Sequence, residues 1–435
     1  MKLFSTRQQS PLARFRQALF AGQAPDGGLY LPTEFPKFSS SWMNKFATLS
    51  YPDLAFSVLD QLVGDEFSPG GLEQVIEQAY SFQPQLSFLN DTDSVLELFH
   101  GPTLSFKDFG AQFMAKSMGW FLQDESREIT ILVATSGDTG SAVAHAYHNV
   151  AGIRIVLLYP SGKVSATQEM QFTTLGDNIT ALEVEGTFDD CQALVKAAFQ
   201  DRDLKERMTL SSANSINIGR LLPQSIYYFW SAAKIISRTG QRPIICVPSG
   251  NFGNICAGLI GDRIGNYAKK FIAAVNANDV IAEYVETGEY RPRPSKSTLS
   301  NAMDVGRPSN WERIETLFDH DHKKITERMW STSVNDKDTR AAMRHTFMDF
   351  GYVADPHTSV ALEGLRRYRA KFAQQDSPAL VLSTAHPAKF HEIVKESLDR
   401  AIELPPALRH RLDKQKKTHR MSTRFDDFKQ FLWRL

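Results

Sequence analysis

The chain has 435 residues, and its 49 basic and 49 acidic side chains leave no net charge. This length exceeds what one hydrophobic core usually serves, so we expect two or more domains. Neutrality argues against a general nucleic-acid or anionic-membrane binder, and no apolar run in the sequence is long enough to span a bilayer.

Cysteine use indicates the compartment. The three cysteines, Cys191, Cys246 and Cys256, form no CxxC pair, and the last two lie in apolar runs. This pattern predicts buried free thiols in a reducing compartment. The N-terminal segment has no long apolar core and is not interpreted as a secretory signal. We expect a cytoplasmic protein without a metal site, either a monomer or a homodimer.

Residues 1–94 form a first region without a catalytic constellation. Residues 26–32 (DGGLYLP) predict a turn that leads into a short extended segment. Helices are predicted at residues 52–63 and 71–80, and Pro52 is tolerated because it lies in the first helical turn. We interpret this region as one that packs on the rest of the chain.

Strands that alternate with helices begin near residue 95. The strands are predicted at residues 95–99, 129–134, 153–158 and 179–184, and the helices at residues 109–122, 141–149, 188–199 and 218–236. The ITILVA run is almost continuously apolar, as expected of a parallel strand covered on both faces. We expect a smaller α/β domain over residues 95–240.

The alternation restarts after the RTGQR stretch. Strands are predicted at residues 243–247, 271–275 and 379–383, helices at 253–264 and 387–400, an exposed loop at 291–297, and a basic solvated tail at 409–420. We expect a larger α/β domain over residues 241–435. Strand–helix alternation favours parallel sheets with right-handed crossovers. The predicted fold class is therefore α/β, with two parallel-sheet domains and an N-terminal region packed on them.

Lys107 lies in the stretch HGPTLSFKDFG, with a single acid, Asp108, beside it. One interpretation is an exposed cation paired with Asp108, because surface ion pairs are common. The other is a Schiff-base lysine, whose amine becomes nucleophilic when it is partly desolvated. The stretch alone favours the exposed cation. Two glycine-containing turns later in the chain reverse this preference and favour the Schiff-base lysine.

The first turn, TSGDTG, joins the ITILVA strand to the next helix. Exposed N–H groups and the helix dipole make such a junction attract anions. The alternative is a simple helix cap by Asp138 or Thr139. Because a cap rarely needs so many small polar residues, we favour an anion site. Its candidate residues are Thr135, Ser136, Gly137, Asp138 and Thr139.

The second turn, PSGNFGN, follows the strand at residues 243–247, at the strand end where open α/β sheets bind ligands. It is not GxxxxGK[ST] and is a poor GxGxxG, so a single small phosphate fits better than a nucleoside triphosphate. Glycines permit close backbone approach, and consecutive N–H groups can form an anion nest. A plain turn is the alternative. The candidate residues are Ser249, Gly250, Asn251, Phe252, Gly253 and Asn254.

A lysine in such a loop and a monophosphate site together favour pyridoxal phosphate. This cofactor is an electron sink that needs a Schiff-base lysine, a phosphate site and a partner for its ring nitrogen. Thr384, in the LSTAHP stretch, can offer its hydroxyl to that nitrogen. A neutral hydroxyl would not hold a proton there as an aspartate would. A helix cap by Ser383 or Thr384 explains this residue alone equally well.

Several stretches together resemble the threonine synthases, pyridoxal-phosphate enzymes of the tryptophan-synthase-β fold type (fold type II). They are DGGLYLP, LELFHGPTLSFKDFG, ATSGDTGSAVAHA, SSANSINIGR, VPSGNFGN, TLSNAMDV and STAHPAKF, in the order of that family and over nearly the whole chain. The set is far more specific than any one member of it.

The resemblance implies a role for each candidate. Lys107 matches the Schiff-base lysine, Thr384 the residue that faces the ring nitrogen, and PSGNFGN the loop that binds the cofactor phosphate. TSGDTG matches the loop that holds the substrate carboxylate, and Asp138 lies near the ring hydroxyl, where some relatives carry Asn. Asp355 and His357 also match the family, but we assign them no role.

A second phosphate site is expected in NSINIGR, because the substrate of the family, O-phosphohomoserine, carries its own phosphate. Asn, Ser and Arg side chains are good phosphate partners, and Arg offers a forked donor. Ser215 and Arg220 are favoured, with Asn214 and Asn217 beside them. The alternative is a helix start capped by Asn214 or Ser215, with Arg220 exposed.

The implied reaction converts O-phosphohomoserine and water to threonine and phosphate, the last step of threonine biosynthesis, with Lys107 as a general base. Closure of one α/β domain over the other would exclude water. Alternatives of the same fold are a serine/threonine dehydratase, a cysteine-synthase-like enzyme, and a phospho-lyase that releases a keto acid, ammonia and phosphate. A non-catalytic protein that binds small anions is the alternative from another class.

Overall fold

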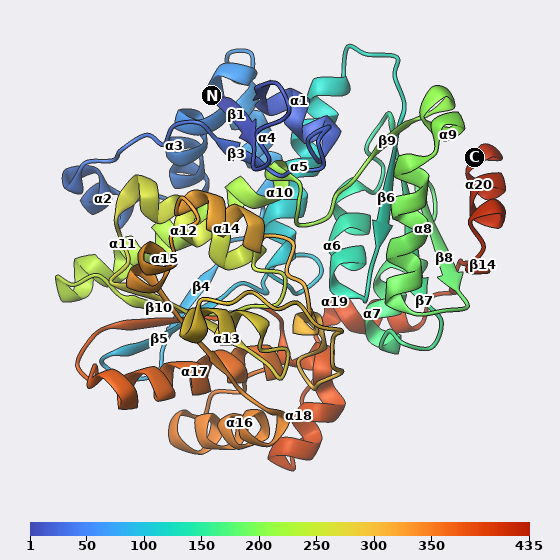
Figure 1. The fold of residues 1–435 in the computed structure, drawn as a ribbon. Helices are drawn as coiled ribbons and strands as arrows, with labels where there is room; N and C mark the ends of the chain where they lie inside the picture. The colour runs from blue at the N-terminus through green and yellow to red at the C-terminus, as the bar shows by residue number, and fades with distance from the viewer.

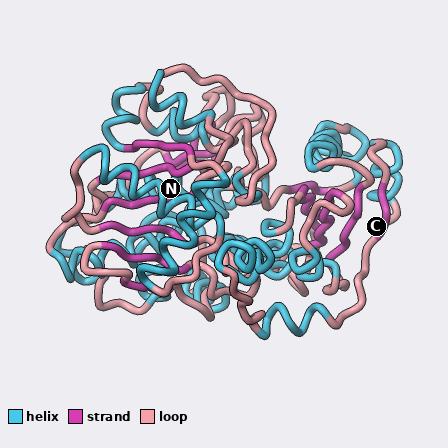
Figure 2. Tube along the Cα trace, turned by 90° about the horizontal axis from the view of Figure 1, so that it is seen from below, coloured by secondary structure: helices cyan, strands magenta, loops and turns pink.

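A computed structural model describes the backbone of residues 1–435 and every side chain except those of Ser40, Trp42 and Leu412. Its strands form three sheets, and helices pack on the two larger ones (Figure 1). These two sheets lie in separate halves of the molecule (Figure 2). This architecture confirms the α/β fold with two parallel sheets that the sequence predicted.

The larger half is built on a six-stranded sheet. Its strands are, in spatial order, β12 (Met329–Ser333), β11 (Lys270–Val275), β10 (Ile244–Pro248), β13 (Ala379–Ser383), β5 (Asp93–Glu97) and β4 (Gln85–Phe88). All neighbours are parallel except β4, which runs antiparallel to β5. Every residue of β10 and β13 is buried, as expected where both faces of a parallel sheet are covered.

Alternate residues of β10 belong to different clusters of buried side chains. Ile245 and Val247 join the main hydrophobic core, whereas Ile244 and Cys246 pack against α17 (Pro356–Phe372). This alternation follows from the two-residue period of a strand. The carboxyl end of β10 is thus held from both faces, and the PSGNFGN turn begins there.

The smaller half is built on a five-stranded, wholly parallel sheet. Its strands are, in spatial order, β14 (His419–Met421), β8 (Ile179–Val184), β7 (Ile153–Pro160), β6 (Ile129–Ala134) and β9 (Thr209–Ser211). Helices α6 (Asp138–Tyr147) and α8 (Phe188–Gln200) lie on opposite faces of it. The TSGDTG turn joins β6 to α6.

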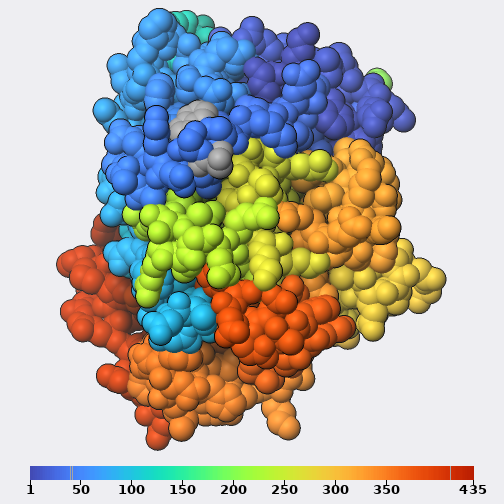
Figure 3. Space-filling model, turned by 90° about the vertical axis from the view of Figure 1, so that its left-hand side faces the viewer, coloured from blue at the N-terminus to red at the C-terminus, as the bar shows by residue number. Residues whose placement is uncertain are grey.

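The N-terminal residues gather at one end of the molecule (Figure 3). They form a three-stranded antiparallel sheet and four helices, which are β1 (Lys2–Ser5), β2 (Ala13–Arg14), β3 (Tyr30–Pro32), α1 (Phe15–Ala21), α2 (Ser40–Phe46), α3 (Tyr51–Val63) and α4 (Gly71–Ala79). Buried apolar residues of α1, α3 and α4 belong to the main core. The predicted helices at 52–63 and 71–80 are confirmed.

Other helices connect the strands or cover the sheets. They are α7 (Ala166–Thr173), α9 (Arg202–Arg207), α12 (Gly253–Gly265), α13 (Val280–Thr287), α14 (Trp311–Leu317), α15 (His322–Arg328), α16 (Asp336–Phe350), α18 (His391–Leu398), α19 (Pro406–Leu412) and α20 (Phe425–Trp433), with 3-10 turns η1 (Gly64–Glu66), η3 (Asn301–Met303) and η4 (Pro387–Phe390). Within the described chain, no helix is both long and apolar enough to cross a membrane.

Sheet membership differs from the expected domain boundaries at two places. Strand β5, which we placed in the smaller domain, pairs with β13 in the six-stranded sheet. Strand β14 was not predicted: its residues, which we placed in the larger domain and partly in a basic solvated tail, pair with β8 in the five-stranded sheet. The C-terminal segment therefore returns to the smaller half, where α20 packs on α8 (Figure 1). A strand pattern predicts the strand but not the sheet edge that it joins.

The long helix predicted over residues 218–236 is interrupted. It is replaced by three segments, α10 (Ile218–Leu221), the 3-10 turn η2 (Leu222–Gln224) and α11 (Ser225–Thr239). Pro223 lies in the turn, and a proline has no N–H to donate and a ring that disfavours a continuous α-helix. The predicted helix at 387–400 likewise begins as the 3-10 turn η4.

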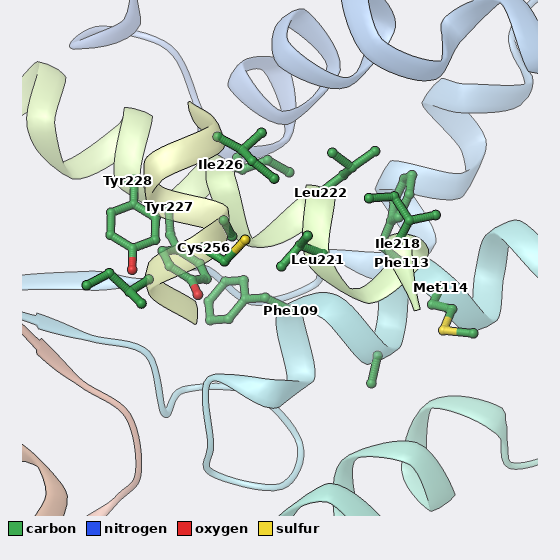
Figure 4. Close-up of a cluster of buried hydrophobic side chains, with 14 of the residues drawn as sticks. Phe109, Phe113, Met114, Ile218, Leu221, Leu222, Ile226, Tyr227, Tyr228 and Cys256 are labelled. Atoms are coloured by element: carbon green, nitrogen blue, oxygen red, sulfur yellow. The ribbon is translucent and has the colours of Figure 1, made fainter. Parts of the chain in front are cut away.

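The main hydrophobic core packs against α5 (Lys107–Leu122), the helix whose first residue is Lys107. Phe109 and Phe113 of α5 belong to the same buried cluster as side chains of α10 and α11 (Figure 4). Gly110 allows the close approach of α5 to α10, because a Cβ there would lie 2.5 Å from the carbonyl oxygen of Arg220. Core packing therefore determines where the Lys107 side chain starts.

Candidate active site

Lys107 pairs with an acid that is distant in the sequence. Its side chain is 13% exposed, and its Nζ donates to Asp138 Oδ2 at 3.2 Å. Asp108 is buried and instead accepts hydrogen bonds from the N–H (2.8 Å) and the hydroxyl (2.6 Å) of Thr103. The interpretation of Lys107 as an exposed cation paired with Asp108 is therefore wrong.

Asp138 is shared between two lysines. The Nζ of Lys389 lies 2.6 Å from Asp138 Oδ1, and Gln168 Nε2 donates to the same oxygen at 2.8 Å. Burial alone would raise the pKa of Asp138, but the ammonium groups of Lys107 and Lys389 outweigh it and hold this pKa well below its usual value. The carboxylate is therefore ionised in the site.

The surroundings of Lys107 lower the pKa of its amine. Burial lowers the pKa of Lys107, Asp138 opposes this by raising it, and the positive charges of Lys389 and Arg220 lower it again, so that the net shift is downward. A lysine whose pKa is lowered by burial is a better nucleophile and base at neutral pH. The environment of Lys107 thus suits a Schiff-base lysine.

In the PSGNFGN turn, the backbone of Gly250 lies close to the backbone of Met303. A Cβ on Gly250 would lie 2.6 Å from the Cα of Met303, so no other residue fits without a shift. Phe252 is left-handed, with φ of 59°, and directly precedes α12. No side chain in the described part of the chain caps this helix. Its first N–H groups have no helical acceptor and can bind an anion.

Asn254 offers a further donor at the start of α12. Its Oδ1 accepts hydrogen bonds from the hydroxyls of Tyr227 (2.8 Å) and Tyr228 (2.7 Å). These bonds orient the amide, and its buried Nδ2 has no partner among the described residues. A buried unpaired donor costs about 1–3 kcal/mol. The turn therefore fits a phosphate that would accept from this amide.

Asn251 connects this turn to NSINIGR. Its Nδ2 donates to Ser215 Oγ at 2.6 Å, and its Oδ1 accepts from the N–H of Ser309 at 2.5 Å. Ser249 donates its hydroxyl to the carbonyl of Val247 at 3.0 Å, so it shapes the turn from within. The two predicted phosphate-binding stretches are therefore neighbours.

The residues of NSINIGR divide into two groups. Asn217 is buried and caps α10 through the N–H of Gly219 (2.9 Å), while its Nδ2 donates to the carbonyl of Leu19 (2.8 Å). Both ends of its amide are thus used within the fold. Asn214 and Ser215 are half-buried and precede the helix. The alternative in which Asn214 or Ser215 caps the helix is wrong.

Arg220 is buried rather than exposed. It is 2% exposed, its Nη1 donates to the carbonyl of Ala213 at 2.7 Å, and its Nε has no partner among the described residues. Burial lowers its pKa to about 10, which leaves it charged at neutral pH. No carboxylate of the described chain forms an ion pair with it. Asp108 raises this pKa without forming an ion pair, and a buried guanidinium that has no direct ion pair is costly, so the site suits an anion.

The TSGDTG turn leaves N–H groups at the start of α6 free to bind a ligand. Thr135 Oγ1 accepts from the N–H groups of Gly137 (3.0 Å) and Gly140 (2.8 Å), so Thr135 shapes the turn. Gly137 is the N-cap of α6 and has no side chain that could cap it, so Thr135 bonds the N–H of Gly140 while those of Asp138 and Thr139 have no helical acceptor. The alternative of a cap by Asp138 or Thr139 is therefore wrong. Ser136 is exposed and Thr139 half-buried, beside the open helix start.

Thr384 lies next to the Lys107 loop. Its carbonyl accepts from the N–H of Phe106 at 2.9 Å, and its side chain is buried. The hydroxyl of the preceding Ser383 is hydrogen-bonded to Thr358 at 2.8 Å. His386, not Ser383 or Thr384, caps the following turn η4. The capping alternative is therefore wrong, and Thr384 remains a candidate for the ring nitrogen.

Two residues of the site were missed or left without a role. Lys389 lies in the STAHPAKF stretch, five residues after Thr384, and only the fold brings it to Asp138. His357 binds Asp355 Oδ1 through Nδ1 (2.8 Å) and accepts from the N–H of Ala302 through Nε2 (3.2 Å). Ala302 adjoins Met303, the residue that faces Gly250. The Asp355–His357 pair therefore supports the segment against which the phosphate turn packs.

Three family models match the chain. The model described as pyridoxal-phosphate dependent enzyme matches residues 95–384. The models described as threonine synthase N terminus and threonine synthase, C-terminal match residues 2–80 and 358–432. Together they cover nearly all of the sequence.

Whole-length relatives agree with these matches. Threonine synthase of Serratia marcescens is 40% identical over 432 residues, with 99% of each chain covered. The structure of threonine synthase from Escherichia coli has a TM-score of 0.92 at 39% identity and covers 100% of both chains. That of PLP-bound threonine synthase from Brucella melitensis has a TM-score of 0.93 at 33% identity, over 99% of this chain and 98% of the other.

These findings confirm three expectations, namely the resemblance, the fold type and the pyridoxal-phosphate dependence. The buried lysine, the open phosphate turn and the buried unpaired arginine agree with them. The chain belongs to the threonine synthase family of pyridoxal-phosphate-dependent enzymes.

Proposed function

We propose that the chain converts O-phosphohomoserine and water to threonine and phosphate. The observation that carries this proposal is Arg220, a buried guanidinium without a carboxylate partner, close enough to Lys107 to lower its pKa. An enzyme acting on a substrate without phosphate needs no second anion site. A phosphorylated amino-acid substrate supplies the missing negative charge.

The residues present fit the cofactor. Lys107 would form the Schiff base, and the PSGNFGN turn, with the N–H groups that begin α12, would hold the cofactor phosphate. Thr384 would face the ring nitrogen, and Asp138 would lie near the ring hydroxyl. When bound, pyridoxal phosphate delocalises the electron pair left by proton removal from the substrate.

Substrate groups are assigned to the two remaining anion sites. The substrate carboxylate would bind the open start of α6, at Ser136, Gly137 and Thr139. The substrate phosphate would bind Arg220 and Ser215, with Asn214 beside them. We do not include Asn217, because both ends of its amide are used within the fold.

Lys107 moves protons in this scheme. Its neutral amine takes the proton from Cα as a general base. Overall, protons leave Cα and Cβ, the C–O bond at Cγ breaks and phosphate leaves with that electron pair and one proton, a proton is added at Cγ, and water adds its hydroxyl at Cβ and its proton at Cα. Arg220 stays charged and holds the phosphate as it leaves. Closure of the two halves would exclude competing water.

The first test is an absorbance spectrum of the purified protein, followed by assays of threonine and phosphate after mixing with O-phosphohomoserine. We expect a visible cofactor band that is lost in Lys107→Ala, and equal amounts of the two products. Phosphate with keto acid but no threonine would make the protein a phospho-lyase. No turnover of the phosphorylated substrate, with serine or threonine deaminated instead, would make it a dehydratase. The absence of a band even with added cofactor would favour an anion-binding protein.

Location and assembly are part of the proposal. Cys191, Cys246 and Cys256 are free and buried, which suits a reducing compartment such as the cytoplasm. We propose a monomer or a homodimer that binds a small-molecule substrate and no nucleic acid. Light scattering of the purified protein measures the mass directly, and a larger assembly would contradict this part of the proposal.

A further inference from the structure

Lys389 is a second buried lysine in the site. Its side chain is 0% exposed, and its ammonium contacts Asp138 Oδ1 at 2.6 Å and the carbonyl of Thr103 at 2.9 Å. Asp138 lies on α6, Thr103 lies in the loop before Lys107, and Lys389 lies in η4. Lys389 therefore joins three segments of the site, and a buried ammonium is retained only where its charge is compensated.

Three charged groups from different elements act on the Lys107 amine. Asp138 on α6 contacts it directly, Lys389 in η4 contacts the other oxygen of the same carboxylate, and Arg220 on α10 adds a positive charge. Asp108, in the first turn of the same helix, points to Thr103 instead, and burial raises its pKa to about 6. The ring of Phe106 lies 5.1 Å from the ammonium.

A carboxylate paired only with Lys107 would hold it as an ammonium ion. An ammonium ion can neither attack a carbonyl carbon nor accept a proton. A second ammonium on the same carboxylate acts against this in two ways. The Lys389 ammonium group neutralises part of the Asp138 charge through its contact with Oδ1. Its positive charge also disfavours a proton on the Lys107 amine.

We propose that Lys389 is a positioning residue of the reaction, whose buried charge holds Asp138 and thereby favours the neutral, nucleophilic amine of Lys107. The inference rests on the proposed role of Lys107 and adds the residue that prepares it. It needs no contact between Lys389 and the substrate, because it acts through Asp138.

Trace acetylation of the full-length protein without cofactor tests this proposal. Acetylation at Lys107, measured by mass spectrometry between about pH 6 and pH 10, reports the pKa of its amine. In Lys389→Met we expect this pKa to rise by about one unit, so that labelling near neutral pH falls roughly tenfold. Lys389→Gln keeps a hydrogen-bond donor but removes the charge, and should show the same shift.

Lys429→Met is the matched control. Lys429 also lies between two carboxylates, Asp201 at 2.8 Å and Asp203 at 2.7 Å, but outside the site. Its replacement should leave the Lys107 profile unchanged. Asp138→Asn tests the same electrostatics without a change at Lys389 and should lower the Lys107 pKa.

An unchanged profile in Lys389→Gln or in Asp138→Asn overturns the proposal. A shift in Lys389→Met but not in Lys389→Gln also overturns it, because the hydrogen bond rather than the charge would then matter. The labelling requires neither cofactor nor substrate. A failure to form threonine would therefore count against the proposed function and leave this result standing.

Discussion

The guanidinium groups of two buried arginines near the site have different hydrogen-bond partners. Arg313 donates through Nε, Nη1 and Nη2 to two backbone carbonyls and to Asn310 Oδ1. Arg220 donates to one carbonyl and keeps its Nε unpaired. Since both are buried, the hydrogen-bond partners rather than exposure separate a structural arginine from a ligand-binding one.

Arg220→Gln should weaken the use of O-phosphohomoserine. Loss of one partner of a buried charge pair costs about 3 kcal/mol, so kcat/KM should fall roughly 100-fold, while the cofactor band stays. Steady-state kinetics and an absorbance spectrum check this. In the control Arg313→Gln, thermal stability should fall instead. Wild-type kcat/KM in Arg220→Gln would contradict a role in substrate binding.

Asp108 should make stability depend on pH. Its pKa of about 6 in the folded protein lies above its ordinary value of 3.8, because burial disfavours the charge. The folded state therefore binds the proton more tightly, and this contribution to stability is complete below about pH 4 and lost as the pH rises through about 6.

Asp108→Asn removes this dependence. Relative to the wild type, the variant should gain on the order of 2 kcal/mol in the free energy of unfolding between about pH 4 and pH 7. Urea unfolding at both pH values measures it. A difference between variant and wild type that is the same at both pH values would show that Asp108 does not titrate in this range.

At the scale of elements, the phosphate turn depends on a segment far from it in the sequence. The backbone of Met303 faces Gly250, and the N–H of Ala302 donates to His357 Nε2. His357 lies in the first turn of α17, and its Nδ1 is hydrogen-bonded at 2.8 Å to Oδ1 of Asp355, the N-cap of this helix. The start of α17 thus holds the η3 segment against the turn that follows β10.

His357→Ala should therefore loosen cofactor binding. Loss of a buried hydrogen bond costs about 1–1.5 kcal/mol, which corresponds to a roughly tenfold higher dissociation constant for pyridoxal phosphate. Titration of the cofactor-free protein, followed by absorbance, measures it. His357→Gln keeps an acceptor for the Ala302 N–H and should recover part of the affinity. Equal affinities in both variants would contradict this explanation.

At the scale of the whole molecule, the C-terminal segment completes the smaller half. Strand β14 extends the five-stranded sheet beyond β8, and Phe428 and Leu432 of α20 enter the buried cluster on one face of it. Lys416 adds ion pairs to Glu169 (2.5 Å) and Glu183 (2.9 Å). The segment therefore stabilises the half that carries the TSGDTG turn.

Phe428→Ala should destabilise the protein. Truncation of a fully buried phenylalanine costs about 3–5 kcal/mol, because apolar contacts are lost and a cavity remains. Thermal unfolding measures the change. Leu435→Ala, in the same segment but 37% exposed, should change stability little. An unchanged melting temperature in Phe428→Ala would mean that α20 does not contribute to the fold's stability.

Much of the fold follows from local sequence patterns. The ITILVA run and the helices at 52–63 and 71–80 lie where the patterns predicted them. The PSGNFGN turn follows its strand for the same reason. Glycines and apolar periodicity act over a few residues, so they can be recognised without knowledge of the rest of the chain.

The sequence by itself therefore determined the central strands of the two larger sheets, the glycine turns and, through several motifs together, the family and the cofactor. Only the tertiary structure decided that Lys107 pairs with Asp138, that Lys389 shares this acid, and that Asn217 is used within the fold. It also decided that β5 and β14 join the sheets opposite to those expected. The physical reason is sequence distance, because ion pairs and sheet edges join residues whose separation no local pattern records.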